Sequence, residues 1–385
     1  LVYDTRNEDT KIAQTDKINV LNLNTLASQT LYTCTEANEF GPGVGAATFS
    51  PKENRVLFIH GTKNASKNKP YSITRRTGVA IDLSFPEKPI YMDARNIYPP
   101  FTLGALRGGT HSHCWHSSQD LISFTYNDYV LETNAAPQSD VDLRTVGVMF
   151  PQTVLVPMDV EQENNSGEMF AVIVAKVTNN PIFGSDEIDK AFDECWLGEK
   201  RSIAFQGNVK TENGATKTEI FIVDLPQDLT QSSNPLQGTL TSRCAVPNGT
   251  NQYRITNTTN GISGFRHWLR SNKKGTIVYF LCEDKNNVTQ LHCVDIQSKK
   301  VTQLSFHSSS IHSPININQT DTAIVYFVDN KIVIFNLLNN EMEVVFKNEK
   351  KLQLSGIPHF DLYKPIVYFN AYVNNSNSNE NFLQI

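Results

Sequence analysis

The sequence predicts an all-β fold, a seven-bladed β-propeller, and two observations lead to this prediction. Short apolar runs recur along the 385 residues: Leu1-Val-Tyr, 56-VLFIHG, 121-LISFTYN, 202-SIAFQG, 276-TIVYFL, 323-AIVYFV and 365-PIVYFN. Polar turns of related composition precede most of these runs, for example 50-SPKENR and 271-SNKKG. Internal repetition at a spacing of about 40 residues is typical of four-stranded propeller blades. We therefore expect residues 1–385 to form a single propeller domain.

Each apolar run has the composition of a β-strand. The runs are short, rich in β-branched and aromatic residues, and bounded by Gly, Asn, Asp, Ser or Pro. Several are followed by a second strand and a polar turn, as in 331-KIVIFNLLNNEMEVVF. The segment before each polar turn is then expected to be the innermost strand of its blade.

One segment, 184-GSDEIDKAFDECWLG-198, departs from this pattern. Its apolar residues fall at helical spacing: Ile188, Ala191, Phe192, Cys195 and Trp196. Ser185 is a suitable N-cap and Gly198 a suitable end of a helix. The sequence therefore predicts a short helical insertion near residues 184–198.

The overall composition excludes several classes of protein. Hydrophobic residues make up 39% and charged residues 19% of the chain, as in a soluble globular protein. The net charge of −5 gives no basic surface for nucleic acid, and no apolar run approaches the roughly 18–20 residues of a membrane span. The six cysteines lack zinc-binding spacing, so free thiols are expected. The choice between a periplasmic and a cytoplasmic protein stays open.

The histidines suggest where a ligand binds. The stretch 107-RGGTHSHCWHSSQD contains three of the nine histidines, and others lie near the start of later predicted inner strands: His267, His312 and His359. Strand entries converge on one mouth of a propeller channel, which is a usual place for a ligand. His111 and His113 alternate by two, so we expect them on one face, where they can chelate a divalent metal such as Mn, Ca or Zn. The alternative is that each histidine only bridges neighbouring blades.

Several longer motifs resemble a known family. They are RGG-x-H-x-H (107–113), SFTYND (123–128), DLR-x-VGV (142–148), GSDEI (184–188), FIVDLPQD (221–228) and RHW (266–268). Together they resemble the YidR family of bacterial β-propeller proteins from residue 1 to about residue 345. This resemblance implies the propeller fold and no particular activity.

More distantly, the chain is similar to TolB-type propellers and to oligogalacturonate lyase. In the lyase, a His-x-His at the start of an inner strand binds a manganese-type ion, and His111 and His113 match that pair. The lyase has a glutamine three residues before the first histidine, whereas this sequence has Gly108.

Two functions are consistent with these features. The first is β-elimination of an acidic oligosaccharide, which requires a cation near the uronate carboxylate and a base for the adjacent proton. Arg266, or a metal on His111 and His113, would supply the cation. Candidates for the remaining roles are His267, His312 or Tyr126 as the base, and Arg107 and His359 as ligand-binding residues. The alternative is a non-catalytic, TolB-like scaffold that binds a ligand or a protein partner.

Overall fold

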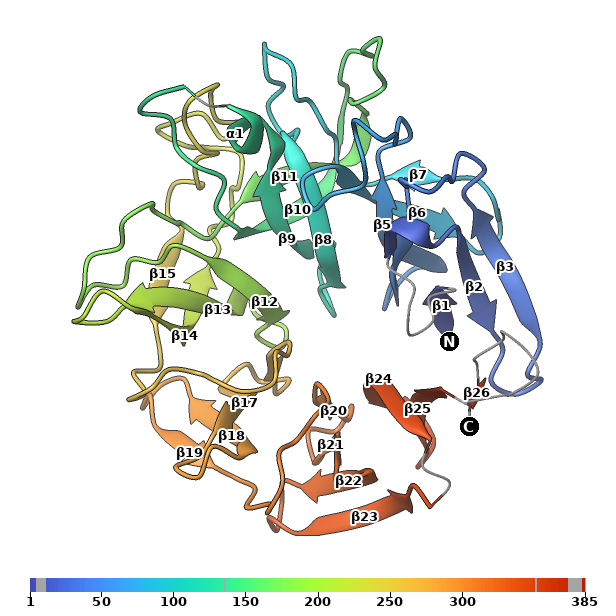
Figure 1. The fold of residues 1–385 in the computed structure, drawn as a ribbon, viewed down its shortest axis with the longest axis vertical. Coiled ribbons are helices and arrows are strands. Elements are labelled where there is room, and N and C mark those ends of the chain that lie inside the picture. The colour runs from blue at the N-terminus through green and yellow to red at the C-terminus, as the bar shows by residue number, and fades with distance from the viewer. Residues whose placement is uncertain (5–11, 135, 350–351, 373–382, 385) are drawn as a thin grey trace. The chain divides into compact units, whose positions relative to one another are not determined.

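The computed structural model describes residues 1–4, 12–134, 136–349, 352–372 and 383–384 (Figure 1). These residues form seven β-sheets, and neighbouring strands in each sheet follow chain order. Five of the sheets have four strands and two have three. Four-stranded sheets of consecutive strands are the blades of a β-propeller, so the predicted fold class is confirmed.

The described residues divide into two compact units, residues 1–192 with 223–252 and residues 193–222 with 253–385. The first unit contains β1 (Val2–Asp4), β2 (Lys17–Leu21), β3 (Ser28–Thr33), β4 (Val44–Phe49), β5 (Arg55–Gly61), β6 (Arg76–Asp82), β7 (Ile90–Tyr91), β8 (Gly108–Trp115), β9 (Ile122–Asp128), β10 (Thr145–Val154), β11 (Gly167–Ile173), the 3-10 turn Ile12–Gln14 and the helix α1 (Tyr129–Thr133).

A further four-stranded sheet comprises β12 (Ala191–Trp196), β13 (Ser202–Lys210), β14 (Thr216–Asp224) and β15 (Asn251–Arg254). The second unit continues with β16 (Arg270–Ser271), β17 (Ile277–Glu283), β18 (Thr289–Asp295), β19 (Val301–Gln303), β20 (Asn316–Ile317), β21 (Ala323–Val328), β22 (Lys331–Asn336), β23 (Met342–Lys347), β24 (Gln353–Phe360), β25 (Val367–Tyr372) and β26 (Leu383–Gln384).

The predicted apolar runs all form strands, and six of them are the second strand of their sheet: β5, β9, β13, β17, β21 and β25. In β5, Val56 and Phe58 pack into one hydrophobic cluster while Leu57 packs into another. Successive side chains of a strand point to opposite faces, so both faces of β5 are buried. This double burial explains why the runs are continuously apolar rather than alternating.

The sheets β1–β3 and β24–β26 have only three strands each. That the propeller has seven complete blades therefore stays a prediction. That residues 1–385 form a single domain also stays a prediction.

The predicted helix at 184–198 is wrong. Residues 191–196 form β12, and all six of its residues are buried. Because both faces of this strand are covered, apolar residues occur at odd and even positions, and a subset of them falls at helical spacing by chance. The α-helix that the described residues do contain is α1, where Asp128 Oδ1 accepts a hydrogen bond from the Leu131 amide at 3.1 Å.

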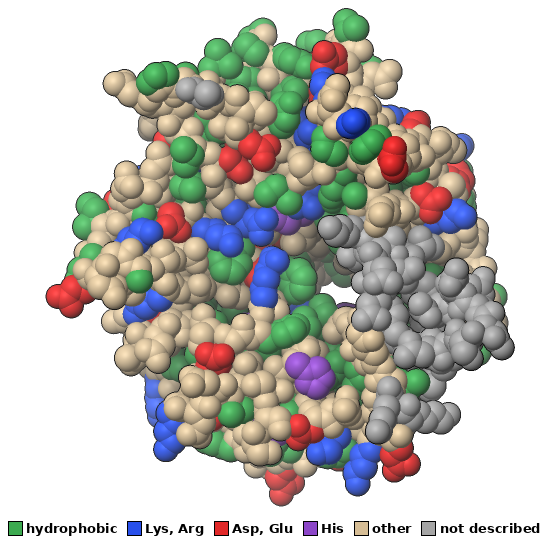
Figure 2. Space-filling view, in the orientation of Figure 1, with side chains coloured by type: hydrophobic (Ala, Val, Ile, Leu, Met, Phe, Trp, Pro, Cys, Tyr) green, Lys and Arg blue, Asp and Glu red, His purple; other side chains and the backbone are tan. Residues whose placement is uncertain are grey.

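No helix among the described residues has the length and hydropathy of a membrane span. The face shown in Figure 2 carries both acidic and basic side chains.

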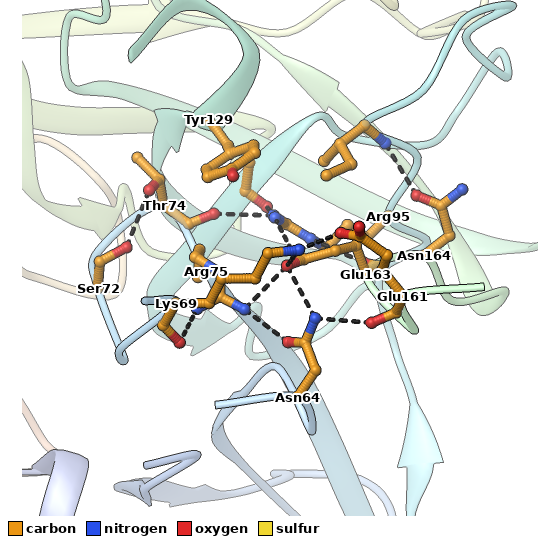
Figure 3. A network of polar contacts seen from close by, with 12 residues as sticks. Asn64, Lys69, Ser72, Thr74, Arg75, Arg95, Tyr129, Glu161, Glu163 and Asn164 are labelled. Carbon is orange, nitrogen blue, oxygen red and sulfur yellow. Dashed lines mark hydrogen bonds and ion pairs between the residues drawn. The ribbon is translucent and has the colours of Figure 1, made fainter. Parts of the chain in front are cut away.

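A buried ion network holds the loops of the first unit in place (Figure 3). Glu163 accepts hydrogen bonds from Arg75 at 2.8 Å and from Arg95 at 3.5 Å, and all three side chains are at most 4% exposed. Arg95 also donates to the carbonyl oxygens of Thr74 at 2.8 Å and Gly108 at 2.5 Å. The network thus joins the loop before β6, the loop before β11 and the first residue of β8.

Candidate functional site

A cleft in the second unit brings two of the predicted site residues together. Arg266 and His312 both line it, beside Phe265, Trp268 and Phe327, and its volume is about 400 Å³. The cleft therefore combines a cation, an imidazole and aromatic surface. This combination suits a ligand with a carboxylate and a carbon skeleton.

Arg266 is anchored on one side and open on the other. Its Nε and Nη2 donate to the Asp193 carboxylate at 2.8 and 2.5 Å, which raises the pKa of Arg266. The Arg266 side chain is nevertheless 60% exposed, and its Nη1 makes no hydrogen bond within the described parts of the chain. The Trp268 ring centroid lies 5.9 Å from the guanidinium carbon. One edge of the guanidinium thus stays available to an anion.

Asp193 is the residue that positions Arg266. Its side chain is 1% exposed, and its backbone has a φ of 53°, a conformation that is uncommon for residues other than glycine. Its carbonyl oxygen also accepts a hydrogen bond from the Leu269 amide at 3.3 Å. Asp193 therefore links β12 to the segment that carries Arg266.

His312 presents its ring to the same cleft. Its backbone amide donates to the Phe327 carbonyl at 3.1 Å, and its ring lies 6.3 Å from the Phe327 ring. The side chain is exposed, and neither ring nitrogen bonds to any residue that the structure describes. Both ring nitrogens of His312 are therefore open to a hydrogen bond with a ligand.

His267 has a structural role instead. Its Nδ1 donates to the Phe265 carbonyl at 2.8 Å, and its Nε2 accepts from the Leu281 amide at 2.8 Å. Burial lowers the pKa of His267 to about 4. With both nitrogens bound to the backbone, the ring has none left for a substrate.

His359 lies seventh in the eight-residue strand β24, where it pairs with Tyr368. The expected position near strand entry is therefore wrong for this residue. Its Nδ1 lies 3.3 Å from the Asn316 side-chain nitrogen. His267 and His312, by contrast, precede the short strands β16 and β20. That all these histidines face one channel mouth stays a prediction.

His111 and His113 lie in the first unit and do not share a face, contrary to the expectation. His111 pairs with Thr125 but Cys114 pairs with Ser123, so β8 has a bulge, and Ser112 has a φ of 56°. The Nε2 of His113 lies 3.0 Å from the Thr110 hydroxyl. Thr110 and His111 are consecutive and point to opposite faces, so His113 lies on the face of Thr110.

This geometry does not fit the predicted metal site. Among the described residues, no three His, Cys, Asp or Glu side chains are grouped to hold a metal ion. Burial and the nearby charge of Arg76 lower the pKa of His113 to about 3. The residues present therefore do not form a chelate on His111 and His113.

Gly78 on β6 accommodates the His113 ring. A Cβ atom at Gly78 would lie 2.8 Å from His113 Nε2 and 3.0 Å from Asp93 Oδ1. Both neighbours are buried, so we expect Gly78→Ala to lower the free energy of unfolding by about 1–3 kcal/mol through overpacking. Thermal unfolding measures this loss. In the double variant Gly78→Ala/His113→Ala the His113 ring is gone and the new methyl group has room, so the loss of unfolding free energy should be smaller than the sum of the two single losses. A loss equal to that sum would contradict the contact between Gly78 and His113.

Arg107 is part of the interior of the first unit. The Arg107 side chain is fully buried and bonds to Asp128 through Nε at 3.2 Å and Nη2 at 2.5 Å. Its Nη2 also donates to the Ser242 carbonyl at 3.0 Å. Arg107 thus binds the fold itself, and the structure gives it no free edge for a ligand.

Tyr126 lines a cavity of about 480 Å³, together with Asp128, Lys176 and Arg243. Its hydroxyl oxygen accepts the Arg107 amide at 3.2 Å. Burial raises the pKa of Tyr126 well above its usual value, so the phenol keeps its proton and is a poor base.

Sequence reasoning missed Asp193 and the role of Trp268. Asp193 lies inside the segment interpreted as a helix, and nothing local marks it as the partner of Arg266, which is 73 residues away. Trp268 was visible in the RHW motif, but its place beside Arg266 depends on the folded backbone.

Comparison with known proteins agrees with the fold. Residues 43–165 match the model of a family described as protein of unknown function (DUF3748). A structure of oligogalacturonate lyase in complex with manganese is 10% identical, with a TM-score of 0.51 over 92% of this chain and 79% of that one. A puromycin-hydrolyzing peptidase from Mycobacterium tuberculosis is 9% identical, with a TM-score of 0.53 over 96% of this chain. This chain spans 49% of the peptidase's length, and both likenesses concern the fold alone.

One curated relative is much closer in sequence. The uncharacterized protein YidR of Escherichia coli (strain K12) is 33% identical over 356 residues, which cover 89% of this chain and 82% of the relative. Identity at this level over most of both chains confirms the resemblance noted in the motifs. The chain belongs to the YidR family.

Proposed function

We propose that the cleft of the second unit binds an acidic oligosaccharide and cleaves it by β-elimination at a uronate. The observation that carries this proposal is the joint presence of Arg266 and His312 in one cleft with Trp268. The free edge of Arg266 would bind the uronate carboxylate, and Trp268 would pack against the apolar face of the sugar ring.

In the proposed reaction, the Arg266 charge acidifies the C–H bond next to the carboxylate. His312 accepts that proton, since imidazole is the side chain most often used as a general base near neutral pH. The electron pair forms a carbon–carbon double bond, and the C–O bond to the leaving sugar breaks. The leaving oxygen takes a proton from water, and the hydroxide so formed takes the proton from the His312 imidazolium, which regenerates both the base and the water.

The test uses the full chain and a panel of polyuronates and oligogalacturonates. Turnover appears as the ultraviolet absorbance of the unsaturated product, and binding is measured by calorimetry. We expect His312→Gln to abolish turnover and to keep binding. We expect Arg266→Gln to weaken binding by roughly tenfold or more, because a hydrogen bond between charged groups is lost.

Lys274→Gln is the control for charge, because Lys274 is exposed and does not line the cleft. Binding without turnover in the unmodified chain would favour the non-catalytic, TolB-like scaffold. If no acidic glycan binds, or if both cleft variants behave like Lys274→Gln, the proposal is overturned.

A further inference from the structure

The cavity beside Tyr126 in the first unit combines an apolar wall with a polar one. Its volume of about 480 Å³ is within the usual range for small-molecule sites. The apolar wall includes Leu143, Ile173, Val177, Val246 and Pro247. The polar wall includes Lys176 and, from the loop before β15, Ser233, Asn234 and Asn248. None of these residues lines the cleft proposed above.

The acidic side chains that line this cavity are already paired with arginines. The Asp128 carboxylate is 5% exposed and lies 2.5 Å from Arg107 Nη2. The Asp140 carboxylate accepts hydrogen bonds from Arg243 Nη1 at 3.1 Å and from the Arg243 backbone amide at 2.9 Å. Each carboxylate therefore has its counter-charge within the fold, and neither adds a net negative charge to the cavity.

The positive charge that remains is the ammonium of Lys176. This side chain is exposed and makes no hydrogen bond or ion pair with the part of the chain that the structure describes. Its backbone is nevertheless fixed, because Gln252 Oε1 accepts the Lys176 amide at 2.8 Å and Gln252 Nε2 donates to the Lys176 carbonyl at 3.2 Å. The cavity thus has one cation without a counter-charge, attached to an anchored point of the chain.

The loop before β15 adds an amide donor to the same cavity. Asn248 Oδ1 accepts hydrogen bonds from the Ser233 amide and the Ser233 hydroxyl, each at 3.1 Å, so its Nδ2 is the group left for a ligand. The Ser232 hydroxyl donates to the Val246 carbonyl at 3.0 Å, and the Asn248 amide donates to the Gln231 carbonyl at 2.8 Å. These bonds order the loop in advance, which lowers the entropic cost of binding.

We infer that this cavity binds a small carboxylate with an apolar body. The Lys176 ammonium and Asn248 Nδ2 are both donors, and they would hold the carboxylate oxygens. Val177 and Val246 would cover the apolar body, whose removal from water is favourable. A single unpaired cation matches the one charge of a carboxylate better than the charge of about two on a phosphate monoester.

Calorimetric titration of the full chain with benzoate, benzamide and acetate tests this inference. Benzoate should bind saturably. Benzamide has nearly the same shape without the charge, and it should bind roughly tenfold more weakly or less tightly still, because a charge-assisted hydrogen bond is lost. Acetate keeps the charge without the apolar ring, so its affinity should also be lower by roughly tenfold or more.

Lys176→Gln should weaken benzoate binding by roughly tenfold or more, because the cation is replaced by a neutral amide. The substitution is at an exposed side chain, so we expect the fold to persist. Lys67→Gln is the matched control, since Lys67 is an exposed lysine of the first unit that does not line the cavity. It should bind benzoate as the unmodified chain does.

Arg266→Gln separates this inference from the proposed cleft function, because that variant should keep its affinity for benzoate. The inference is overturned if benzoate does not bind, if benzamide binds equally well, or if Lys176→Gln and Lys67→Gln have equal affinity. Benzoate binding that is lost in Arg266→Gln and kept in Lys176→Gln would locate the ligand in the cleft and also overturn it.

Discussion

Glu163→Gln is expected to lower the free energy of unfolding by about 3–5 kcal/mol, because it leaves two buried guanidinium groups without their counter-charge. Arg75 and Arg95 are 4% and 0% exposed in their side chains, so water cannot replace the lost carboxylate. Glutamine keeps the shape of the side chain and one acceptor oxygen. The loss of unfolding free energy therefore comes from the missing negative charge and not from a cavity.

Urea unfolding of the purified variant measures this effect. Glu161→Gln is the matched control two residues away, since Glu161 is 55% exposed and pairs with Lys69 at the surface. Its substitution should leave the unfolding midpoint close to that of the unmodified chain, because a solvent-exposed ion pair contributes little to stability. Equal midpoints for the two variants would show that the buried network does not hold the loops together.

The second large effect is a dependence of stability on pH that comes from His267. Its pKa is about 4 in the folded chain, because its ring is buried, whereas the unfolded chain has a pKa near 6.5. Between pH 4 and pH 6.5, the His267 ring is therefore protonated in the unfolded chain and neutral in the folded chain. The contribution of His267 to the free energy of unfolding is therefore fully present above pH 6.5. It is lost as the pH falls towards 4, and the loss is on the order of 3 kcal/mol.

In His267→Gln this contribution is absent. The variant should be less stable than the unmodified chain at pH 7.5, since the Leu281 amide and the Phe265 carbonyl lose their partner. The difference in unfolding free energy between the variant and the unmodified chain should be smaller by about 2–3 kcal/mol when unfolding is measured at pH 4.5.

Thr302→Val serves as the control for this experiment, because Thr302 on β19 is exposed and its side chain has no titratable group in this pH range. It should keep the pH dependence of the unmodified chain. If the difference in unfolding free energy between His267→Gln and the unmodified chain is the same at every pH, the pH dependence does not come from His267.

The strand content was predictable because the apolar runs are rich in strand-forming residues and bounded by turn residues, and several of them, such as β5, are buried on both faces. The same property caused the error at residues 184–198. In β12 all six residues are buried, so the alternation that marks a half-exposed strand is missing, and the remaining spacing resembles a helix.

The candidate site was only partly predictable. Arg266 and His312 were identified from their position before the inner strands, and they do share a cleft. His111 and His113 were expected on one face because residues two apart on a regular strand point the same way. The bulge at Ser112 breaks that rule, and no sequence signal marks it.

By itself, the sequence determined the all-β repeat architecture and the family, since both depend on local composition and on motifs read along the chain. The tertiary structure alone decided which polar residues are available to a ligand. Arg107, Arg95 and Arg266 carry the same charge, but the side chains of the first two are fully buried against their partners, and Arg266 keeps a free edge. Burial and pairing depend on contacts between distant segments, so they appear only once the chain is folded.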